Sequence, residues 1–228
     1  MWLPTFYVVL LFNIFKTVLC QFTVANGIYS FGYFNGTSKA KLSNVLDVLR
    51  PQTGFSFRTC MDHGTLFYQR NIIGDSITLK LDNGDVIFSL QSVVDNINTS
   101  VSYEGNFNNN EWIHVMFQHN STTDQGSNLY LSIGNHTNLL YNSITDPTIF
   151  NMEFSESSVT FIGGNEDPNE NFNGCLSSGP YFNFQAYNGT NVQWNNCPLL
   201  NTNICGPRCN DSVCNNGSCI ATNTEISC

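Results

Sequence analysis

Short runs of alternating apolar and polar residues, separated by turn residues, are the feature that most limits how this chain can fold. Ile77, Leu79 and Leu81 alternate with polar residues, and a second alternating run covers residues 86–90. Between them stands Asp-Asn-Gly-Asp at residues 82–85. Alternation is typical of half-buried β-strands, and Asn-Gly tolerates the positive φ values of a tight hairpin turn. These residues therefore predict a β-hairpin.

The same pattern recurs along most of the chain. Further strands are expected at residues 54–59, 65–69, 112–117, 129–133, 159–162 and 181–187. Helical spacing occurs only in Lys39–Leu49, before Pro51, and a strand followed by a turn fits that segment equally well. No fixed period repeats, which excludes solenoids and propellers. Many short strands with turns between them predict an all-β, antiparallel sandwich.

The first twenty residues resemble a secretory signal peptide. Phe6–Phe15 is almost entirely apolar, yet it is shorter than the roughly 20 residues that span a bilayer. Val18 and Cys20 place small residues at −3 and −1 of a cut before Gln21, as signal peptidase requires. An N-terminal core strand is the alternative, since no Lys or Arg precedes the apolar run. We expect a signal peptide at residues 1–20, no transmembrane segment after it, and a secreted protein.

Charge excludes one class of partner. The chain has 8 Lys+Arg against 17 Asp+Glu, a formal net charge of −9 at pH 7. Binding to nucleic acid requires clustered cations that displace counterions from phosphates. The cations here are scattered along the sequence. We therefore expect neither a nucleic-acid partner nor a basic patch of the heparin-binding kind.

The cysteines divide the chain into two parts. Cleavage after Cys20 leaves eight of the nine cysteines, an even number that fits complete disulfide pairing in an oxidising compartment. Five of them lie near the C-terminus, at Cys205, Cys209, Cys214, Cys219 and Cys228. Their spacing lacks the paired Cys-x-x-Cys units that zinc sites prefer. A small, disulfide-stabilised C-terminal tail is therefore expected, because so short a segment cannot bury a core.

The ordered segments resemble laminin G-like domains. The matching segments are 54–59, 64–68, 77–85, 105–115, 129–131, 161–164 and Phe172-Asn173-Gly174-Cys175-Leu176. The resemblance covers roughly residues 22–200 and implies a jelly-roll β-sandwich of the laminin G or concanavalin A kind over residues 21–200. The tail resembles the first four cysteines of an EGF-like module, which implies a partial module at residues 205–228 and a longer parent protein.

The resemblance also implies a set of disulfides. Within the sandwich it pairs Cys175 with Cys197, closing a loop of about 20 residues worth about 3 kcal/mol in the chain-entropy model. The EGF-like pattern implies these tail pairs: Cys209–Cys219 and Cys214–Cys228. Elimination then leaves Cys60 to pair with Cys205. In the alternative, Cys60 is a free thiol and Cys205 pairs with the missing part of the EGF-like module.

Three other positions carry structural expectations. Trp112, at a strand start, is expected to fill the core between the sheets. His114 is expected on the face opposite Ile113, with no nucleophile motif to serve. Gly163 and Gly164 are expected to form a bend or bulge where side chains do not fit.

Laminin G-like domains often hold Ca²⁺ at one rim, and the resemblance implies where its ligands would lie. Asp95 follows the strand after the Asp-Asn-Gly hairpin, and Ser155 with Glu156 precedes the Ile-Gly-Gly segment. Oxygen ligands of this kind suit Ca²⁺. The family has Asp or Asn where this chain has Ser155, which weakens the expected site.

We expect a non-catalytic extracellular recognition module for cell adhesion or matrix interaction. It would bind a protein or glycan through its rim loops, in a secreted protein or the ectodomain of a cell-surface protein. The alternative is a carbohydrate-active or lectin-type sandwich that uses Glu153 or Glu156. Glycosidases need two carboxylates about 5–9.5 Å apart, but no two acidic residues alternate on a strand here, and no hydrolase or phosphate-loop motif occurs.

Seven Asn-x-Ser/Thr sequons accompany the expected secretion. They lie at Asn35, Asn98, Asn120, Asn135, Asn188, Asn210 and Asn216. They are candidate glycosylation sites if the signal peptide is accepted.

Overall fold

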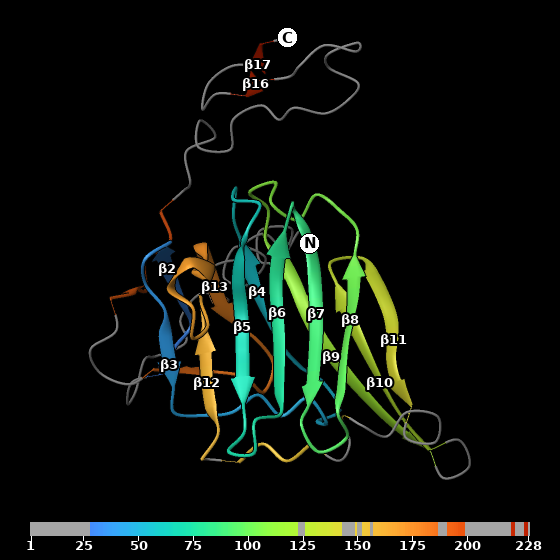
Figure 1. The fold of residues 1–228 in the computed structure, drawn as a ribbon. Coiled ribbons are helices and arrows are strands. Elements are labelled where there is room, and N and C mark those ends of the chain that lie inside the picture. Colours follow the sequence, from blue (N-terminus) through green and yellow to red (C-terminus); the bar gives the residue numbers. More distant parts are fainter. Residues whose placement is uncertain are drawn as a thin grey trace, which may run out of the picture.

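The computed structural model describes residues 28–122, 126–142, 149, 152–155, 157–186, 191–198, 220–221 and 226–227. Within these residues, two large antiparallel sheets lie face to face (Figure 1). None of the helical segments in the described part of the chain has the length and apolar character that a membrane-spanning helix needs. The all-β sandwich expected from the alternating runs is confirmed.

One sheet has seven strands in the order β11-β10-β9-β4-β13-β2-β15. Its strands are β2 (Phe31–Asn35), β4 (Thr53–Arg58), β9 (Ile113–Thr122), β10 (Gly126–Ile133), β11 (His136–Asn142), β13 (Asn173–Ser178) and β15 (Gln193–Trp194). The other sheet has six strands in the order β3-β12-β5-β6-β7-β8. Its strands are β3 (Ala40–Leu42), β5 (Gly64–Arg70), β6 (Ser76–Asp82), β7 (Asp85–Ser92), β8 (Ile97–Tyr103) and β12 (Val159–Ile162).

Smaller elements complete the described structure. Strand β1 (Ile28–Tyr29) pairs with β14 (Phe184–Gln185), and a 3-10 turn, η2, covers Pro168–Glu170. In the tail, β16 (Ile220–Ala221) pairs with β17 (Ile226–Ser227). The expected signal peptide and most of the expected EGF-like module lie outside the described residues. The division of the chain into those domains therefore stays a prediction.

Phenylalanines fill the space between the sheets. Nine are at least 99% buried: Phe34, Phe55, Phe57, Phe67, Phe88, Phe117, Phe172, Phe182 and Phe184. Many pack edge to face, including Phe182 and Phe184 with ring centroids 5.6 Å apart, a geometry that suits the quadrupole of the aromatic ring. The strands supply them at alternate positions, as in β7, where Val86, Phe88 and Leu90 are buried.

The structure confirms the predicted hairpin and settles the ambiguous segment. Strands β6 and β7 pair from Asp82 with Asp85 onward, and both Asn83 and Gly84 have positive φ, at 54° and 85°. Segment Lys39–Leu49 forms strand β3 followed by turns, so the strand-and-turn alternative is correct.

The prediction that Trp112 fills the core is wrong. It is 38% exposed and lies just outside strand β9, which begins one residue later at Ile113. The guanidinium of Arg58 lies 5.4 Å from the centre of the indole ring, and such a cation stabilises the π face. Phe107 and Val115, which flank this position in the sequence, are buried in the core instead.

Gly163 is needed at the end of β12. Its φ of +71° is rarely adopted by other residues, and an added Cβ would lie 2.1 Å from Cδ1 of the buried Phe34. The predicted bend is confirmed, and its cause is the close approach of the Phe34 ring.

Gly163→Ala is expected to destabilise the sandwich by more than the roughly 1–2 kcal/mol that a left-handed conformation costs an L-residue. Gly134→Ala is the matched control, because Gly134 has φ +57° but an added Cβ meets nothing closer than 3.9 Å. Urea unfolding of both variants measures the difference. Equal losses would show that the Phe34 contact contributes nothing.

Candidate functional site

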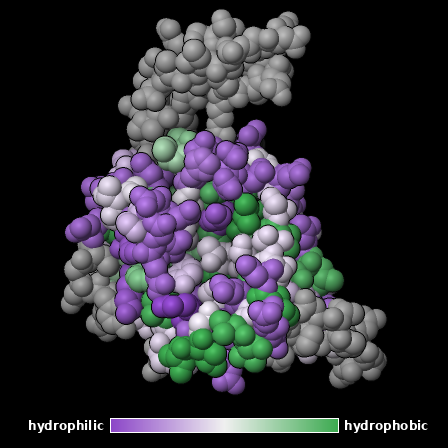
Figure 2. All heavy atoms as spheres, in the orientation of Figure 1, coloured by the Kyte–Doolittle hydropathy of each residue, from purple (hydrophilic) through white to green (hydrophobic). Residues whose placement is uncertain are grey.

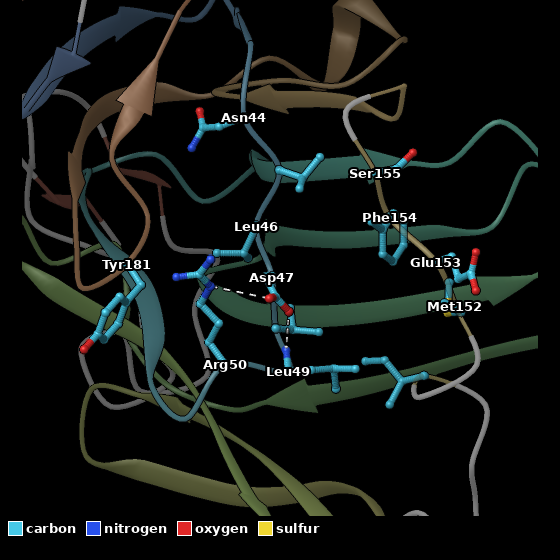
Figure 3. Close-up of a pocket in the computed structure, with 13 residues that line it drawn as sticks. Asn44, Leu46, Asp47, Leu49, Arg50, Met152, Glu153, Phe154, Ser155 and Tyr181 are labelled. Carbon is cyan, nitrogen blue, oxygen red and sulfur yellow. Dashed lines mark hydrogen bonds and ion pairs between the residues drawn. The ribbon is translucent and has the colours of Figure 1, made fainter.

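A cavity of about 650 Å³ lies at one edge of the sandwich. We call this the lower edge: β5 and β7 end there, β6, β8 and β12 begin there, and Figure 1 draws it at the bottom. Segment 44–50, which follows β3, forms one wall of the cavity, and Ile149 with residues 152–155 forms another. Tyr181 lies on one side of segment 44–50 and residues 152–155 lie on the other (Figure 3).

Gln69 in β5 holds segment 44–50 in place. Its side chain is fully buried. The Oε1 atom accepts a hydrogen bond from the Leu46 amide at 2.8 Å, and Nε2 donates to the Leu46 carbonyl at 3.1 Å. The Thr160 hydroxyl in β12 also donates to Oε1, at 3.2 Å. One side-chain amide thus satisfies both backbone groups of Leu46 where no strand pairs with them.

Asn71 and Asp75 join three segments at the lower edge. Both side chains are buried, with 6% and 4% exposure. Asn71 Nδ2 donates to Asp75 Oδ2 at 2.9 Å and to the Glu153 carbonyl at 3.3 Å. The other carboxylate oxygen of Asp75 accepts from the Val93 amide at 2.7 Å. The β5–β6 turn, the β7–β8 turn and the 152–155 wall are therefore hydrogen-bonded to one another.

The floor of the cavity is apolar. Leu46, Val48, Ile149 and Met152 line it and belong to the hydrophobic core, with no more than 7% of any of them exposed. A ligand in this cavity would contact hydrocarbon below and polar groups at the mouth, which is the usual composition of small-molecule sites.

The mouth of the cavity carries one cation, two carboxylates and an aromatic ring. Arg50 Nε lies 3.4 Å from Asp47 Oδ2, and both side chains are about half exposed. The guanidinium carbon of Arg50 is 5.9 Å from the centre of the Tyr181 ring, which is 69% exposed. Glu153 is exposed on the opposite wall. Asp47 Oδ1 also accepts a hydrogen bond from the Leu49 amide at 3.1 Å. Because the Asp47–Arg50 pair is exposed to water it adds little stability, so a ligand can compete for either group.

The expected calcium ligands are only partly described. Asp95 is exposed in the β7–β8 turn, where its Oδ2 accepts a hydrogen bond from Ser92 Oγ at 3.3 Å. Ser155 lines the cavity, with its hydroxyl 2.7 Å from that of Ser157. Glu156 lies outside the described residues.

These oxygens do not yet amount to a calcium site. Ca²⁺ takes six to eight oxygen ligands, whereas Asp95 and Ser155 supply one carboxylate and one hydroxyl. Among the described residues, no group of three His, Cys, Asp or Glu side chains lies close enough to hold a metal. Calcium binding therefore stays a prediction.

The Cys175–Cys197 disulfide is present, with 5.8 Å between the two Cα atoms. Cys60 is also disulfide-bonded. Its expected partner Cys205 lies outside the described residues, so that pairing stays a prediction. The remaining expected disulfide cysteines also lie outside the described residues: Cys209, Cys214, Cys219 and Cys228.

Four of the candidate glycosylation sites are described, and all four are exposed: Asn35, Asn98, Asn120 and Asn135. Asn35 Oδ1 accepts from the amide of Thr37 at 3.1 Å and from its hydroxyl at 2.9 Å. The other three sequons, at Asn188, Asn210 and Asn216, lie outside the described residues. Exposure is compatible with glycosylation, which stays a prediction.

His114 has a partner that sequence reasoning missed. It is exposed, as expected, and its Nδ1 lies 2.7 Å from Ser56 Oγ on the neighbouring strand β4. Neither residue lines the cavity. The pair lies on the outward face of the seven-stranded sheet, whereas a serine nucleophile needs a cleft and a group that orients its base.

Replacing Gln69 with leucine is expected to loosen the 44–50 wall. The Leu46 amide and carbonyl would lose their buried partners, at a cost on the order of 2–4 kcal/mol. Hydrogen exchange at the Leu46 amide should accelerate. Thr160→Val is the matched control, since it removes one bond to Gln69 and leaves both Leu46 bonds intact. Unchanged exchange in Gln69→Leu would contradict the role assigned to Gln69.

Comparison with known proteins supports the fold assignment. The model of the laminin G domain family matches residues 57–180, which is more than half of the chain. No curated protein matches this chain.

Several solved structures are distantly similar. The LG1-3 region of the laminin alpha2 chain has a TM-score of 0.49 and 18% identity, over 68% of this chain and 31% of that one. Domains LG4-5 of the mouse laminin alpha1 chain have a TM-score of 0.46 and 16% identity, over 68% and 43%. The CBM40 domain of Ruminococcus gnavus IT-sialidase, bound to alpha2,3 sialyllactose, has a TM-score of 0.41 and 12% identity, over 67% and 89%.

The chain spans less than half the length of either laminin structure. The family match runs from the end of β4 to just past β13 and so covers most, though not all, strands of the two sheets. This chain belongs to the laminin G domain family, whose members are extracellular, non-catalytic binding modules.

Proposed function

We propose that this protein is an extracellular recognition module for cell adhesion or matrix interaction, and that it binds a neutral glycan in the lower-edge cavity. The observation that carries the proposal is the exposed Tyr181 ring beside a cavity of about 650 Å³ with an apolar floor. Loops held by a rigid scaffold are the usual position of binding residues.

The composition of the cavity suits a sugar. A pyranose ring has an apolar face, formed by C–H groups, and a periphery of hydroxyls. The Tyr181 ring offers a flat apolar surface with a polar tip. The carboxylates of Asp47 and Glu153 and the guanidinium of Arg50 can exchange hydrogen bonds with hydroxyls.

The charge at the mouth favours a neutral sugar over an acidic one. Asp47 and Glu153 supply two carboxylates against the single guanidinium of Arg50, and Asp47 already engages it. A ligand carboxylate or sulfate would have to compete with Asp47 and approach Glu153. The net charge of the whole chain, −9, acts in the same direction.

Three features support an extracellular location. The first twenty residues predict a signal peptide, and the Cys175–Cys197 disulfide fits an oxidising compartment. The four described sequons are exposed. A longer parent protein, secreted or attached to a cell surface, remains part of the proposal.

Tyr181→Ala is expected to weaken glycan binding about tenfold, which corresponds to about 1.4 kcal/mol, because the ligand loses its stacking surface. A panel of neutral glycans screened on an array identifies a ligand, and calorimetry then compares the variants. Tyr130→Ala is the matched control, since Tyr130 in β10 is partly exposed and does not line the cavity. Equal affinity in Tyr181→Ala, or binding of acidic glycans alone, would contradict the proposal.

The carbohydrate-active alternative differs in one measurement. If the site hydrolysed its ligand, reducing ends would appear with time and Glu153→Gln would abolish them. The proposed recognition module instead binds without turnover, and Glu153→Gln changes affinity only. Detection of reducing ends from the wild-type protein would replace the proposal with the enzymatic alternative.

Calcium is tested separately. If Asp95 contributes to a rim site, millimolar CaCl₂ should raise the melting temperature of the wild-type protein, because an ion that binds only the folded state stabilises it. Asp95→Ala should lose that increase, whereas Glu104→Ala, which removes an exposed carboxylate just beyond the far end of β8, should keep it. An unchanged melting temperature in the wild type would exclude a site of that affinity.

A further inference from the structure

Four aliphatic side chains protrude from two adjacent turns at the lower edge. Ile72 and Ile73, in the β5–β6 turn, are 80% and 57% exposed, and Val93 and Val94, in the β7–β8 turn, are 51% and 71% exposed. Figure 2 shows hydrophobic atoms gathered at the lower border of the molecule, where Figure 1 draws these turns. We call these four residues the apolar tip. Clustered exposed apolar surface marks an interaction site.

The apolar tip is held rigidly. The Asp75 carboxylate accepts a hydrogen bond from the Val93 amide at 2.7 Å and so links the two turns. A Cβ on Gly74 would lie 3.1 Å from Cγ2 of Val93, which shows how closely the turns pack. The four side chains therefore stay exposed because their turns are fixed by buried polar contacts beneath them.

Five backbone amides around the apolar tip have hydrogen-bond partners within the protein. Asn71 Oδ1 accepts from the amides of Ile73, Gly74 and Asp75, at 3.0, 2.9 and 2.9 Å. The Val93 amide donates to Asp75, and the Asp95 amide donates to Ser92 Oγ at 3.2 Å. In exposed turns such amide donors are usually hydrogen-bonded to water instead. In an apolar phase every unsatisfied amide costs several kilocalories, so these five bonds lower the cost of moving the turns out of water.

A second copy of the chain fits the apolar tip poorly. A stable dimer interface needs about 20–30 residues a side, and the tip has four. A protein groove is also disfavoured, because hot spots are rich in Trp, Tyr and Arg and the tip has none of these. A lipid bilayer requires only apolar side chains and imposes no matching shape.

The charges beside the apolar tip select the kind of lipid. Asp95 is exposed on the β7–β8 turn, and Glu153 is exposed next to the β5–β6 turn. Arg70, the cation that ends β5, is paired with Glu166 at 2.7 Å. Anionic headgroups would face carboxylates here, whereas a zwitterionic surface carries no net charge. We propose that the apolar tip inserts into a zwitterionic bilayer, with Asp95 at headgroup level.

The four inserting side chains line no part of the cavity, so this proposal does not depend on the glycan ligand, although Glu153 lies beside both. It would nevertheless orient the cavity, because both lie on the lower edge. Membrane insertion would bring the mouth of the cavity close to the headgroups, where glycans on lipids or on membrane proteins begin.

Flotation with phosphatidylcholine vesicles tests the proposal on the full secreted chain. The wild type should float with the vesicles, equally well in 0.1 M and 0.5 M NaCl. The double variants Ile72→Ser/Ile73→Ser and Val93→Ser/Val94→Ser should each lose at least about tenfold in partition coefficient. Met61→Ser/Leu139→Ser is the control, because both side chains are exposed apolar groups outside the tip. The melting temperatures of all variants establish that they are folded.

A fluorescence experiment reports insertion directly. Tryptophan placed by Ile73→Trp should be quenched by lipids brominated near the headgroup, and Leu139→Trp should not. No flotation of the wild type, flotation that requires phosphatidylserine, or tip variants that float like the control would overturn the proposal. A dimer detected by sedimentation would also overturn the proposal if the tip variants abolished it and the control variant did not. In that case the apolar tip would bind a second copy of the chain.

Discussion

The two-way hydrogen bond between the Gln69 side chain and Leu46 is the interaction on which the candidate site depends. A sandwich places its strands by ladder pairing, but the chain leaves β3 at Leu42 and crosses the lower edge without a strand partner. Buried backbone groups need partners, and Gln69 supplies them from an inward-facing position that an apolar residue would normally occupy. The segment is thereby fixed over the core, and Asp47 and Arg50 extend from it to the mouth of the cavity.

Asn71 and Asp75 extend the same principle along the lower edge. Their buried side chains satisfy amides of both turns and the Glu153 carbonyl. A fully satisfied polar network within an apolar environment favours one arrangement over its alternatives. The same buried side chains, Asn71 and Asp75, therefore support both the cavity wall and the apolar tip. Different residues face the solvent in each.

Sequence reasoning succeeded where the deciding interactions are local. Asn83 and Gly84 determine their turn within four residues, and the alternation of β6 and β7 follows from the two-residue period of a strand. The prediction for Trp112 failed. A large aromatic residue next to a strand is usually buried, and the sequence does not reveal that Arg58 packs on the exposed indole ring. It also missed the cavity, since Arg50 and Tyr181 are far apart in sequence and meet only when β3 and β14 approach. Gln69 could have been noticed, because it is a polar residue at an inward-facing position of β5. The alternating pattern alone does not explain why a polar residue stands there.

The position of Cys60 has a mechanical consequence. Cys60 lies between the end of β4 and the start of β5, at the edge opposite the cavity, and it is covalently crosslinked. Tension applied between that crosslink and a ligand at the lower edge would run along the length of β5. The hydrogen bonds that β5 makes with β6 and β12 would then be loaded in shear and share the force, whereas a pull across the sheet would break them one after another. In a domain built this way, a pull from the proposed ligand site toward Cys60 would meet all the hydrogen bonds of β5 together.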